Sequence, residues 1–258
     1  MTTTPLIAVL PYCRKDQALA TKLLQWISDL GGCKDHSCIL LADTQVPEVE
    51  RAALKELARK SFRHAGTLPC TPPKAALHPP NFMFLMAAQQ MQLSYKLPWL
   101  WLEPDCVPLR AQWLDLIANE YALCCKKFMG NLTTGKQEGL PTVHLPGVSV
   151  YPNNAYDLYS KIESLKTENV AWDMEAAGAV VPRSAHTSLI HHFWGEPELP
   201  PTFVLQRKPD SPQNCLQLGF INKNAVLFHR CKDGSLIELL RSVLKIPAAI
   251  PTPPPAKT

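Results

Sequence analysis

The sequence predicts an α/β protein with a mostly parallel central sheet flanked by helices. Short, continuously apolar runs alternate with segments of helical periodicity in the first third of the chain, which is the β-α-β-α order of a parallel sheet. After residue 125 the apolar runs become shorter, which predicts a smaller mixed β region. The chain has 258 residues, of which 46% are hydrophobic and 19% charged, a composition sufficient for one large α/β domain.

The first sixty residues predict two buried strands and two helices. Leu6–Leu10 is an unbroken apolar run and indicates a strand buried on both faces. Asp16 then precedes residues 17–30, whose apolar positions recur at helical spacing, so it is a candidate N-cap. Residues 37–42 form a second apolar run, and residues 47–61 have the pattern of an amphipathic helix.

The middle of the chain predicts a loop, a helix, a third strand and another helix. Residues 62–80 are rich in proline and favour irregular structure. Residues 81–93 have helical periodicity, with Asn81 as the expected cap after two prolines. Residues 98–102 are a bulky apolar run, typical of a buried strand, and residues 111–125 favour a helix.

The C-terminal half predicts short elements. Helices are expected over 154–166 and 235–245, residues 188–194 fit either strand or helix, and strands are expected over 142–145, 147–151, 179–182 and 225–229. Residues 246–258 contain five prolines and predict an extended tail.

Charge and cysteine content limit the class of protein. The net charge of +4 is compatible with an anionic substrate but far below that of a dedicated nucleic-acid binder. Nine cysteines without a C-x-x-C pattern, together with no apolar run long enough for a membrane span, predict a reduced, cytoplasmic protein without a membrane partner. Cys33, His36 and Cys38 are the only compact Cys/His group, and their spacing is a poor zinc pattern.

Sequence motifs of three other classes of protein are absent or incomplete. Gly130–Lys136 nearly matches a phosphate-binding P-loop, but Gln137 stands where the pattern requires Ser or Thr, so we expect a flexible loop. The sequence contains neither G-x-S-x-G nor G-x-G-x-x-G, so serine hydrolase and dinucleotide oxidoreductase functions lack support.

Two acids directly follow the third strand. Glu103 and Asp105 are spaced i, i+2, so both side chains can face one point at the carboxyl end of the strand, where α/β sheets bind ligands. Carboxylates there favour Mg²⁺ or Mn²⁺ as partner. The alternative is that both acids are solvated, or that one caps the following helix.

A histidine and a lysine follow the last predicted strand. His229 ends the apolar run over 225–229 and is placed to complete the coordination of a cation held by Asp105. Lys232 is a candidate for a diphosphate contact. A surface histidine followed by an Asp-Gly turn is the alternative.

These motifs together resemble the GT-A fold of nucleotide-sugar-dependent glycosyltransferases, over residues 5 to about 240. Pro11–Arg14 matches the nucleotide-holding loop after the first strand, Glu103–Asp105 the D-x-D-type metal motif, and His229 with Lys232 the C-terminal element. Glu103 departs from the motif, which makes Asp105 the safer ligand.

The resemblance implies a division of labour within one catalytic domain over 1–245. Residues 5–125 would bind the nucleotide-sugar, and residues 126–245 would bind the acceptor and supply the last metal ligand. The implied donor-site residues are Pro11, Tyr12, Arg14, Asp43, Asn81 and Lys232, and the implied metal ligands are Glu103, Asp105 and His229.

The acceptor side is expected around residues 169–175. Asp173, next to Trp172, is the first candidate for a general base and Glu175 the second; a helix start is the structural alternative. His186, His191 and His192 are further candidates for the acceptor pocket.

The predicted reaction is therefore transfer of a sugar, with a UDP-sugar as the expected donor and Mn²⁺ or Mg²⁺ as cofactor, to an acceptor hydroxyl. A small molecule, a protein or a modified nucleobase in DNA remain open as acceptors. A nucleotidyltransferase that makes a nucleotide-sugar and a non-catalytic nucleotide-binding module are the alternative functions. Pro11–Asp16 lacks the glycines that a nucleotidyltransferase loop usually has.

Overall fold

The computed structural model describes most of the chain. The described residues are 4–72, 79–137, 140–167, 170–193, 205–206, 217–218 and 221–246. The predicted tail beyond residue 246 lies outside them, as do Asn169 and Trp194.

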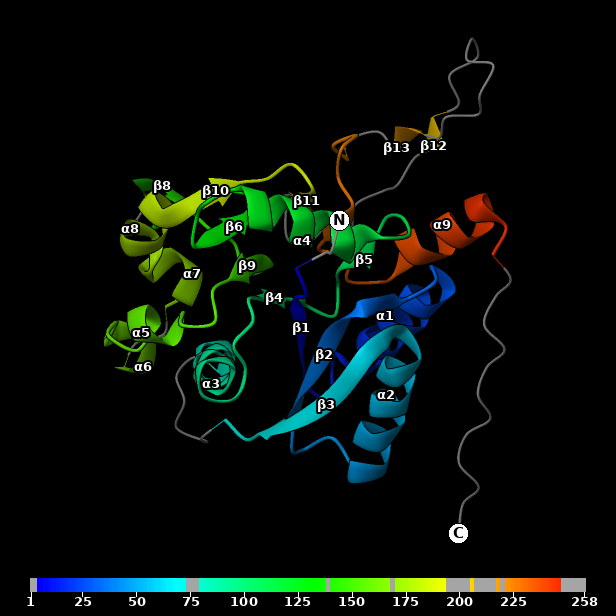
Figure 1. Ribbon diagram of the computed structural model, residues 1–258, viewed down its shortest axis with the longest axis horizontal. Helices are drawn as coiled ribbons and strands as arrows, with labels where there is room; N and C mark the ends of the chain where they lie inside the picture. The colour runs from blue at the N-terminus through cyan, green and yellow to red at the C-terminus, as the bar shows by residue number, and fades with distance from the viewer. Residues whose placement is uncertain are drawn as a thin grey trace.

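A seven-stranded sheet forms the centre, in the order β10-β6-β9-β4-β1-β2-β3. Only β9 runs antiparallel to its neighbours within this sheet, so the predicted mostly parallel sheet is confirmed. Strands from both halves of the chain contribute to it (Figure 1). The strands are β1 (Ile7–Tyr12), β2 (Cys33–Asp43), β3 (Phe62–Cys70), β4 (Trp99–Trp101), β6 (Phe128–Gly130), β9 (Ser149–Tyr151) and β10 (Ser184–His186).

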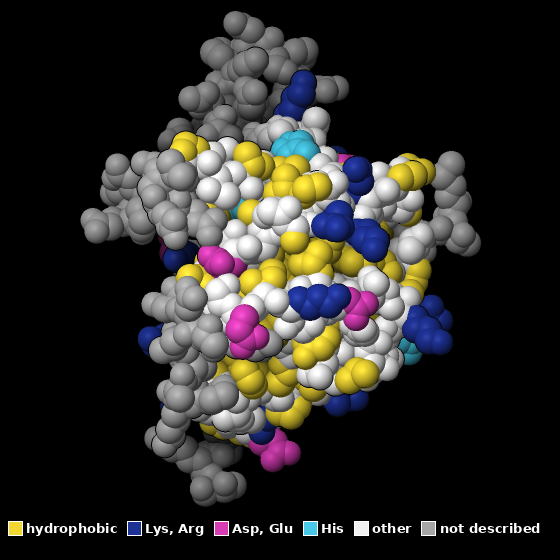
Figure 2. Space-filling view, turned by 90° about the vertical axis from the view of Figure 1, so that its left-hand side faces the viewer, with side chains coloured by type: hydrophobic (Ala, Val, Ile, Leu, Met, Phe, Trp, Pro, Cys, Tyr) yellow, Lys and Arg dark blue, Asp and Glu magenta, His cyan; other side chains and the backbone are white. Residues whose placement is uncertain are grey.

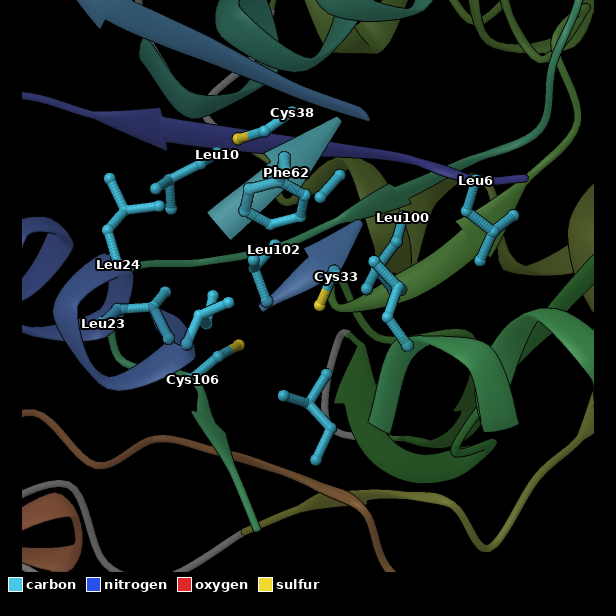
Figure 3. Packing of buried hydrophobic residues seen from close by; sticks show 14 of the residues in the cluster. Leu6, Leu10, Leu23, Leu24, Cys33, Cys38, Phe62, Leu100, Leu102 and Cys106 are labelled. Carbon is cyan, nitrogen blue, oxygen red and sulfur yellow. The ribbon is translucent and has the colours of Figure 1, made fainter. Parts of the chain in front are cut away.

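The continuous apolar runs arise because the sheet is covered on both faces. In β1, Ala8 and Leu10 pack into the hydrophobic cluster on one side, whereas Ile7 and Val9 pack into the cluster on the other. Successive strand residues point to opposite faces, so neither face tolerates a polar residue. Figure 3 shows the first cluster, with Leu10 of β1 near Leu23 and Leu24 of the first helix.

Helices cover both faces of the sheet. The first cluster is closed by α1 (Gln17–Asp29), α2 (Glu48–Ser61) and α4 (Trp113–Leu123). The second is closed by α3 (Pro79–Ser94), α5 (Tyr156–Tyr159), α6 (Ser164–Thr167), α7 (Trp172–Glu175) and α8 (Ala177–Val180). The 3₁₀ turn η1 (Val181–Arg183) follows α8 and has no buried residue. No helix in the described part of the chain is long and apolar enough to cross a membrane.

A smaller mixed region completes the fold, as predicted. A three-stranded sheet has the order β11-β14-β5, built from β11 (Ile190–His192), β14 (Leu227–His229) and β5 (Val107–Pro108). It is followed by α9 (Ser235–Leu244), which packs near α1 (Figure 1). The remaining pairs are β7 (Thr133–Gln137) with β8 (Leu140–His144) and β12 (Leu205–Gln206) with β13 (Gln217–Leu218).

Trp26 of α1 connects this region to the central sheet. Its indole Nε1 donates a hydrogen bond to Pro108 O of β5 at 2.7 Å, and its ring packs with Phe228 of β14 and Leu236 of α9. The Arg241 guanidinium of α9 also pairs with Asp29 at the end of α1. Because β14 carries His229, these contacts fix the C-terminal residues of the site against the N-terminal half.

Three predicted loops or strands are wrong. Residues 62–70 form β3, which pairs in parallel with β2 at the sheet edge, where the missing amide hydrogen of Pro69 is tolerated. Residues 179–182 belong to α8 and η1, not to a strand. The P-loop-like segment contributes β7 to a hairpin, so it is not an irregular loop, because backbone pairing with β8 satisfies its hydrogen bonds.

Two predicted helices differ in extent. Residues 154–166 contain two one-turn helices, α5 and α6, not one continuous helix. Helix α3 begins at Pro79, so Asn81 lies inside its first turn and is not its cap. Asp16 does occupy the N-cap position of α1, but its side chain makes no capping hydrogen bond and accepts one from Cys13 Sγ.

Candidate functional site

The structure brings Glu103, Asp105 and His229 together at the carboxyl end of β4. His229 Nε2 donates a hydrogen bond to Glu103 Oε2 at 2.9 Å and lies 3.2 Å from Asp105 Oδ1. Glu103 and His229 are 126 residues apart in the sequence, and the antiparallel pairing of β5 with β14 joins them. A hydrogen bond from Cys231 N to Asp105 O at 2.9 Å holds the two segments in register.

The pKa values of His229 and Asp105 are shifted in the directions expected for an ion pair. Burial opposes charge on the His229 ring, but the Glu103 and Asp105 carboxylates outweigh it and raise the pKa of His229 to about 9. Burial also opposes ionisation of Asp105, but His229 and then Lys232 hold the pKa of that carboxyl below its usual value. The site is therefore two negative charges around one positive charge.

The residues fit a divalent cation. In an octahedral site with Mg²⁺–oxygen distances of ~2.1 Å, adjacent ligand atoms are about 3 Å apart. The separations from His229 Nε2, 2.9 Å to Glu103 Oε2 and 3.2 Å to Asp105 Oδ1, are of this size. Asp105 Oδ1 is also buried, and apart from its ion pair with His229 it has no hydrogen-bond partner in the described part of the chain, so it is open to a cation.

Cys106 is adjacent to the cluster but suits it poorly. Asp105, Cys106 and His229 each offer one possible ligand atom, and these three atoms lie within 4.8 Å of one another. However, Cys106 is buried in the hydrophobic cluster shown in Figure 3, near Leu23 and Leu102. Burial raises the pKa of its thiol well above the ordinary value, and a neutral thiol is a weak ligand for hard cations. Asp105 and His229 are thus the ligand pair that the geometry supports, and Glu103, 2.9 Å from His229 Nε2, is the adjacent carboxylate.

A cavity of about 710 Å³ adjoins these residues. Its volume lies in the range of pockets for organic cofactors. Six residues predicted from the sequence line it, namely Pro11, Tyr12, Asp43, Glu103, Asp105 and Lys232. They come from the ends of β1, β2 and β4 and the segment after β14, so the parallel strands and the C-terminal segment build one pocket.

The polar groups of β1 and β2 contribute in different ways. The Tyr12 side chain is only 1% exposed and packs in the core, so little of its ring is available for stacking. Its hydroxyl is buried without a hydrogen-bond partner among the described residues, and burial raises its pKa to about 12. Asp43 Oδ1 accepts a hydrogen bond from Gln45 N at 2.8 Å, which orients the carboxylate at the end of β2.

Two predicted donor-site residues lie elsewhere. Arg14 is exposed and does not line the cavity; Lys15 and Asp16 do. Asn81 is fully buried, and its side-chain amide donates to Leu165 O and Val170 O. The side-chain Oδ1 of Asn81 also accepts a hydrogen bond from Trp172 N at 3.2 Å. The Asn81 side chain therefore holds the start of α7 in place and does not line the cavity.

The two acids predicted for the acceptor side have different interactions. Burial raises the pKa of Asp173, and the Glu103 carboxylate raises it further while His144 opposes the shift, so Asp173 is electrostatically linked to the cluster of Glu103, Asp105 and His229. Glu175 Oε2 instead accepts a hydrogen bond from Ser164 Oγ at 3.0 Å, toward α6. Neither lines the main cavity, although Trp172 does.

Of the two tryptophans in the pocket wall, the sequence pointed to Trp172, next to Asp173, but not to Trp101. Trp101 and Trp172 both line the cavity, with ring centroids 6.4 Å apart and planes at 78°. Trp101 was recognised only as part of an apolar strand, and nothing local shows that its end reaches a pocket. Of the three predicted histidines, His191 stacks on Phe228 and His186 is exposed on β10, and only His192 contacts the cluster.

Comparison with known structures identifies the fold. No family model matches the chain, and no curated protein matches it in sequence. The galactosyltransferase LgtC, solved in complex with donor and acceptor sugar analogs, has a TM-score of 0.56 at 10% identity, over 95% of this chain and 98% of LgtC. An active-site mutant of LgtC gives a TM-score of 0.58 at 11% identity. The bifunctional glycosyltransferase WbbM gives 0.52 at 9% identity, over 88% of this chain and 45% of WbbM.

The chain has the GT-A fold. The GT-A fold expected from three short motifs is thereby confirmed for nearly the whole chain. At identities near 10% the likeness establishes fold, and the chemistry is argued from the site itself.

Proposed function

We propose that this protein is a metal-dependent glycosyltransferase that transfers a sugar from a nucleotide-sugar, with UDP-sugar as the donor, to an acceptor hydroxyl. The observation that carries the proposal is the contact of His229 with Glu103 and Asp105, two acids that line a cavity of about 710 Å³. The hard donor atoms of these residues suit Mn²⁺ or Mg²⁺, and the cavity has space for a nucleotide. The alternatives of a nucleotidyltransferase and of a binding module are outcomes of the tests below.

In this proposal residues 5–125 hold the donor. A cation on Glu103, Asp105 and His229 would neutralise the negative charge that develops on the diphosphate leaving group. Lys232 lines the same cavity and supplies a further positive charge for the diphosphate. Asp43, oriented by Gln45 N, and the buried Tyr12 hydroxyl offer hydrogen bonds to the base or ribose.

The acceptor side belongs to residues 126–245. Asp173 is the proposed general base, because its raised pKa brings the carboxylate nearer to the basicity that proton abstraction requires. Glu175, bonded to Ser164, is the second candidate. Trp101 and Trp172 give the neighbouring wall an apolar surface of the kind that sugar rings contact.

The donor assignment is tested by thermal shift with UDP, GDP, CDP and their sugars, in Mn²⁺ or EDTA. We expect one nucleotide to raise the Tm only with Mn²⁺, because selective binding to the native state stabilises it. Asp105→Asn should abolish that shift, whereas Glu238→Gln, at an exposed Lys22 pair on α9, should retain it. No shift with any nucleotide would exclude the donor site.

Product analysis separates the classes of enzyme. A glycosyltransferase releases UDP from a UDP-sugar, a nucleotidyltransferase releases pyrophosphate from UTP and a sugar phosphate, and a binding module releases neither. We expect Asp173→Asn to reduce UDP release at least 100-fold and Glu175→Gln to have a smaller effect. Equal losses would contradict the assignment of the base to Asp173.

Salt dependence and mass spectrometry together separate the three acceptor classes. Figure 2 shows basic side chains among hydrophobic ones on one face of the molecule. A second cavity of about 450 Å³ is lined by Lys127, Lys161 and Arg183, which could contact a polyanion. Acceptor binding that weakens steeply with salt would indicate DNA, whereas turnover independent of salt would indicate a small molecule. Modification of a protein substrate is read directly by mass spectrometry.

A further inference from the structure

The Nδ1 atoms of His192 and His229 are in contact with each other. His192 Nδ1 lies 2.7 Å from His229 Nδ1, and the two rings cross at 69°. Strand pairing brings the two side chains together, because β11 pairs in parallel with β14 and places His192 opposite His229. Two ring nitrogens at this distance share one hydrogen, since two lone pairs would repel each other.

The direction of this hydrogen bond follows from the contacts of Nε2, the other ring nitrogen of His229. His229 Nε2 faces Glu103 and Asp105, where the proposed cation lies. A neutral imidazole that gives Nε2 to a metal carries its single hydrogen on Nδ1. His229 Nδ1 is then the donor and His192 Nδ1 the acceptor.

We propose that His192 is a positioning residue that accepts a hydrogen bond from His229 Nδ1 and thereby fixes the His229 ring with Nε2 directed at Glu103 and Asp105. The inference rests on the proposed function, because it concerns the ligand set of the same cation. A hydrogen-bond acceptor behind a metal-binding histidine fixes its tautomer and ring orientation, and removal of such a partner typically costs 10- to 100-fold in metal affinity.

The test is the affinity for Mn²⁺, measured by electron paramagnetic resonance on the full chain, with Mn²⁺ alone and with UDP. His192→Leu removes the acceptor at similar size and should weaken Mn²⁺ binding roughly 10- to 100-fold. His192→Asn restores a side-chain acceptor and should recover most of the affinity. His191→Phe is the matched control, because it changes the neighbouring histidine on β11, keeps the stacking on Phe228 and loses only the exposed hydrogen bond from Asn222 N among the contacts described for His191.

Three outcomes overturn parts of the proposal in distinguishable ways. A folded His192→Leu protein with the wild-type Kd for Mn²⁺ would overturn the positioning role and leave the metal site intact. If Mn²⁺ binding is weakened equally in His192→Leu and His192→Asn, His192 acts only through packing, and the hydrogen-bond role is overturned. No Mn²⁺ binding by the wild-type protein would overturn the metal site itself, and the proposed function with it.

A measurement on the wild-type protein covers the case in which the leucine variant does not fold. With ¹⁵N-labelled histidine and bound Mg²⁺, we expect His229 Nδ1 to be protonated and His192 Nδ1 to have the chemical shift of an unprotonated acceptor. A protonated His192 Nδ1 would reverse the hydrogen bond and overturn the proposal.

Discussion

Gly147 lies directly against the carboxylate of Glu103. A Cβ atom at residue 147 would be 2.7 Å from Glu103 Oε1, and 3.4 Å and 3.7 Å from ring atoms of Trp172 and Trp101. The two tryptophan distances are ordinary contacts, so only the carboxylate would have to move. Glycine at this position therefore makes room for one ligand of the proposed metal site.

Gly147→Ala should reduce metal affinity more than stability. The end of the flexible Glu103 side chain can move at little cost to the fold, but it would leave its position beside His229. We expect roughly tenfold weaker Mn²⁺ binding with a nearly unchanged Tm, measured by magnetic resonance and calorimetry. Gly178→Ala is the control, because a Cβ at this helical position meets no atom within 4 Å. Unchanged Mn²⁺ affinity in Gly147→Ala would show that Glu103 is not a ligand.

Lys232→Ala should weaken nucleotide binding, and Arg14→Ala should not. Both residues were predicted for the donor site, but only Lys232 lines the cavity. Loss of a charged contact to the diphosphate is expected to raise the Kd for UDP roughly tenfold in calorimetric titration. The arginine variant removes an equal charge from an exposed position next to the pocket. An equal loss in both variants would mean that general positive charge, not a specific contact, attracts the nucleotide.

Asn81→Ala should destabilise the fold by about 2 to 4 kcal/mol. The substitution leaves Leu165 O, Val170 O and Trp172 N without their buried partner. Denaturant unfolding measures the loss, and UDP titration of the folded variant measures its effect on the site. A stability equal to that of the wild-type protein, together with loss of UDP binding, would instead support the nucleotide contact predicted from the sequence.

His36 should make the protein less stable as the pH falls below about 6.5. Its Nδ1 accepts a hydrogen bond from Leu6 N at 2.9 Å, so the ring is neutral and its Nε2–H faces Asp115 Oδ1. Burial lowers the pKa of His36 below 6.5, although Asp115 and Asp35 oppose the shift. The unfolded chain therefore binds more protons in this window, and the free energy of unfolding rises with pH across it.

The pH effect is isolated by comparison with His36→Gln, whose amide can accept from Leu6 N and donate to Asp115 without titrating. We expect the stability difference between about pH 5.5 and about pH 7.5 to be smaller in this variant than in the wild-type protein. Other titrating groups contribute to both proteins and cancel in the comparison. An identical pH dependence would show that His36 does not titrate differently in the two states.

Local sequence patterns were sufficient to predict the elements whose environment is the same all along their apolar runs. The apolar runs that became β1, β2 and β4 are buried on both faces, so composition alone marks them. The acids after β4 and the histidine after β14 also stood out locally, because polar side chains directly follow buried strands. Because ligands bind at the carboxyl ends of strands in α/β sheets, the acids predicted a site there, but His229 reaches them only because β14 pairs with β5 in a separate sheet.

Elements and contacts that depend on a distant partner could be recognised only in the folded protein. The β3 edge strand has a half-exposed sequence containing Pro69, and it is a strand because β2 offers it backbone hydrogen bonds. The burial of Asn81 against α7 and the meeting of His192 with His229 likewise result from pairings across 91 and 37 residues. Such contacts leave no periodic signal in the sequence, because the partner and not the neighbouring residues creates the environment.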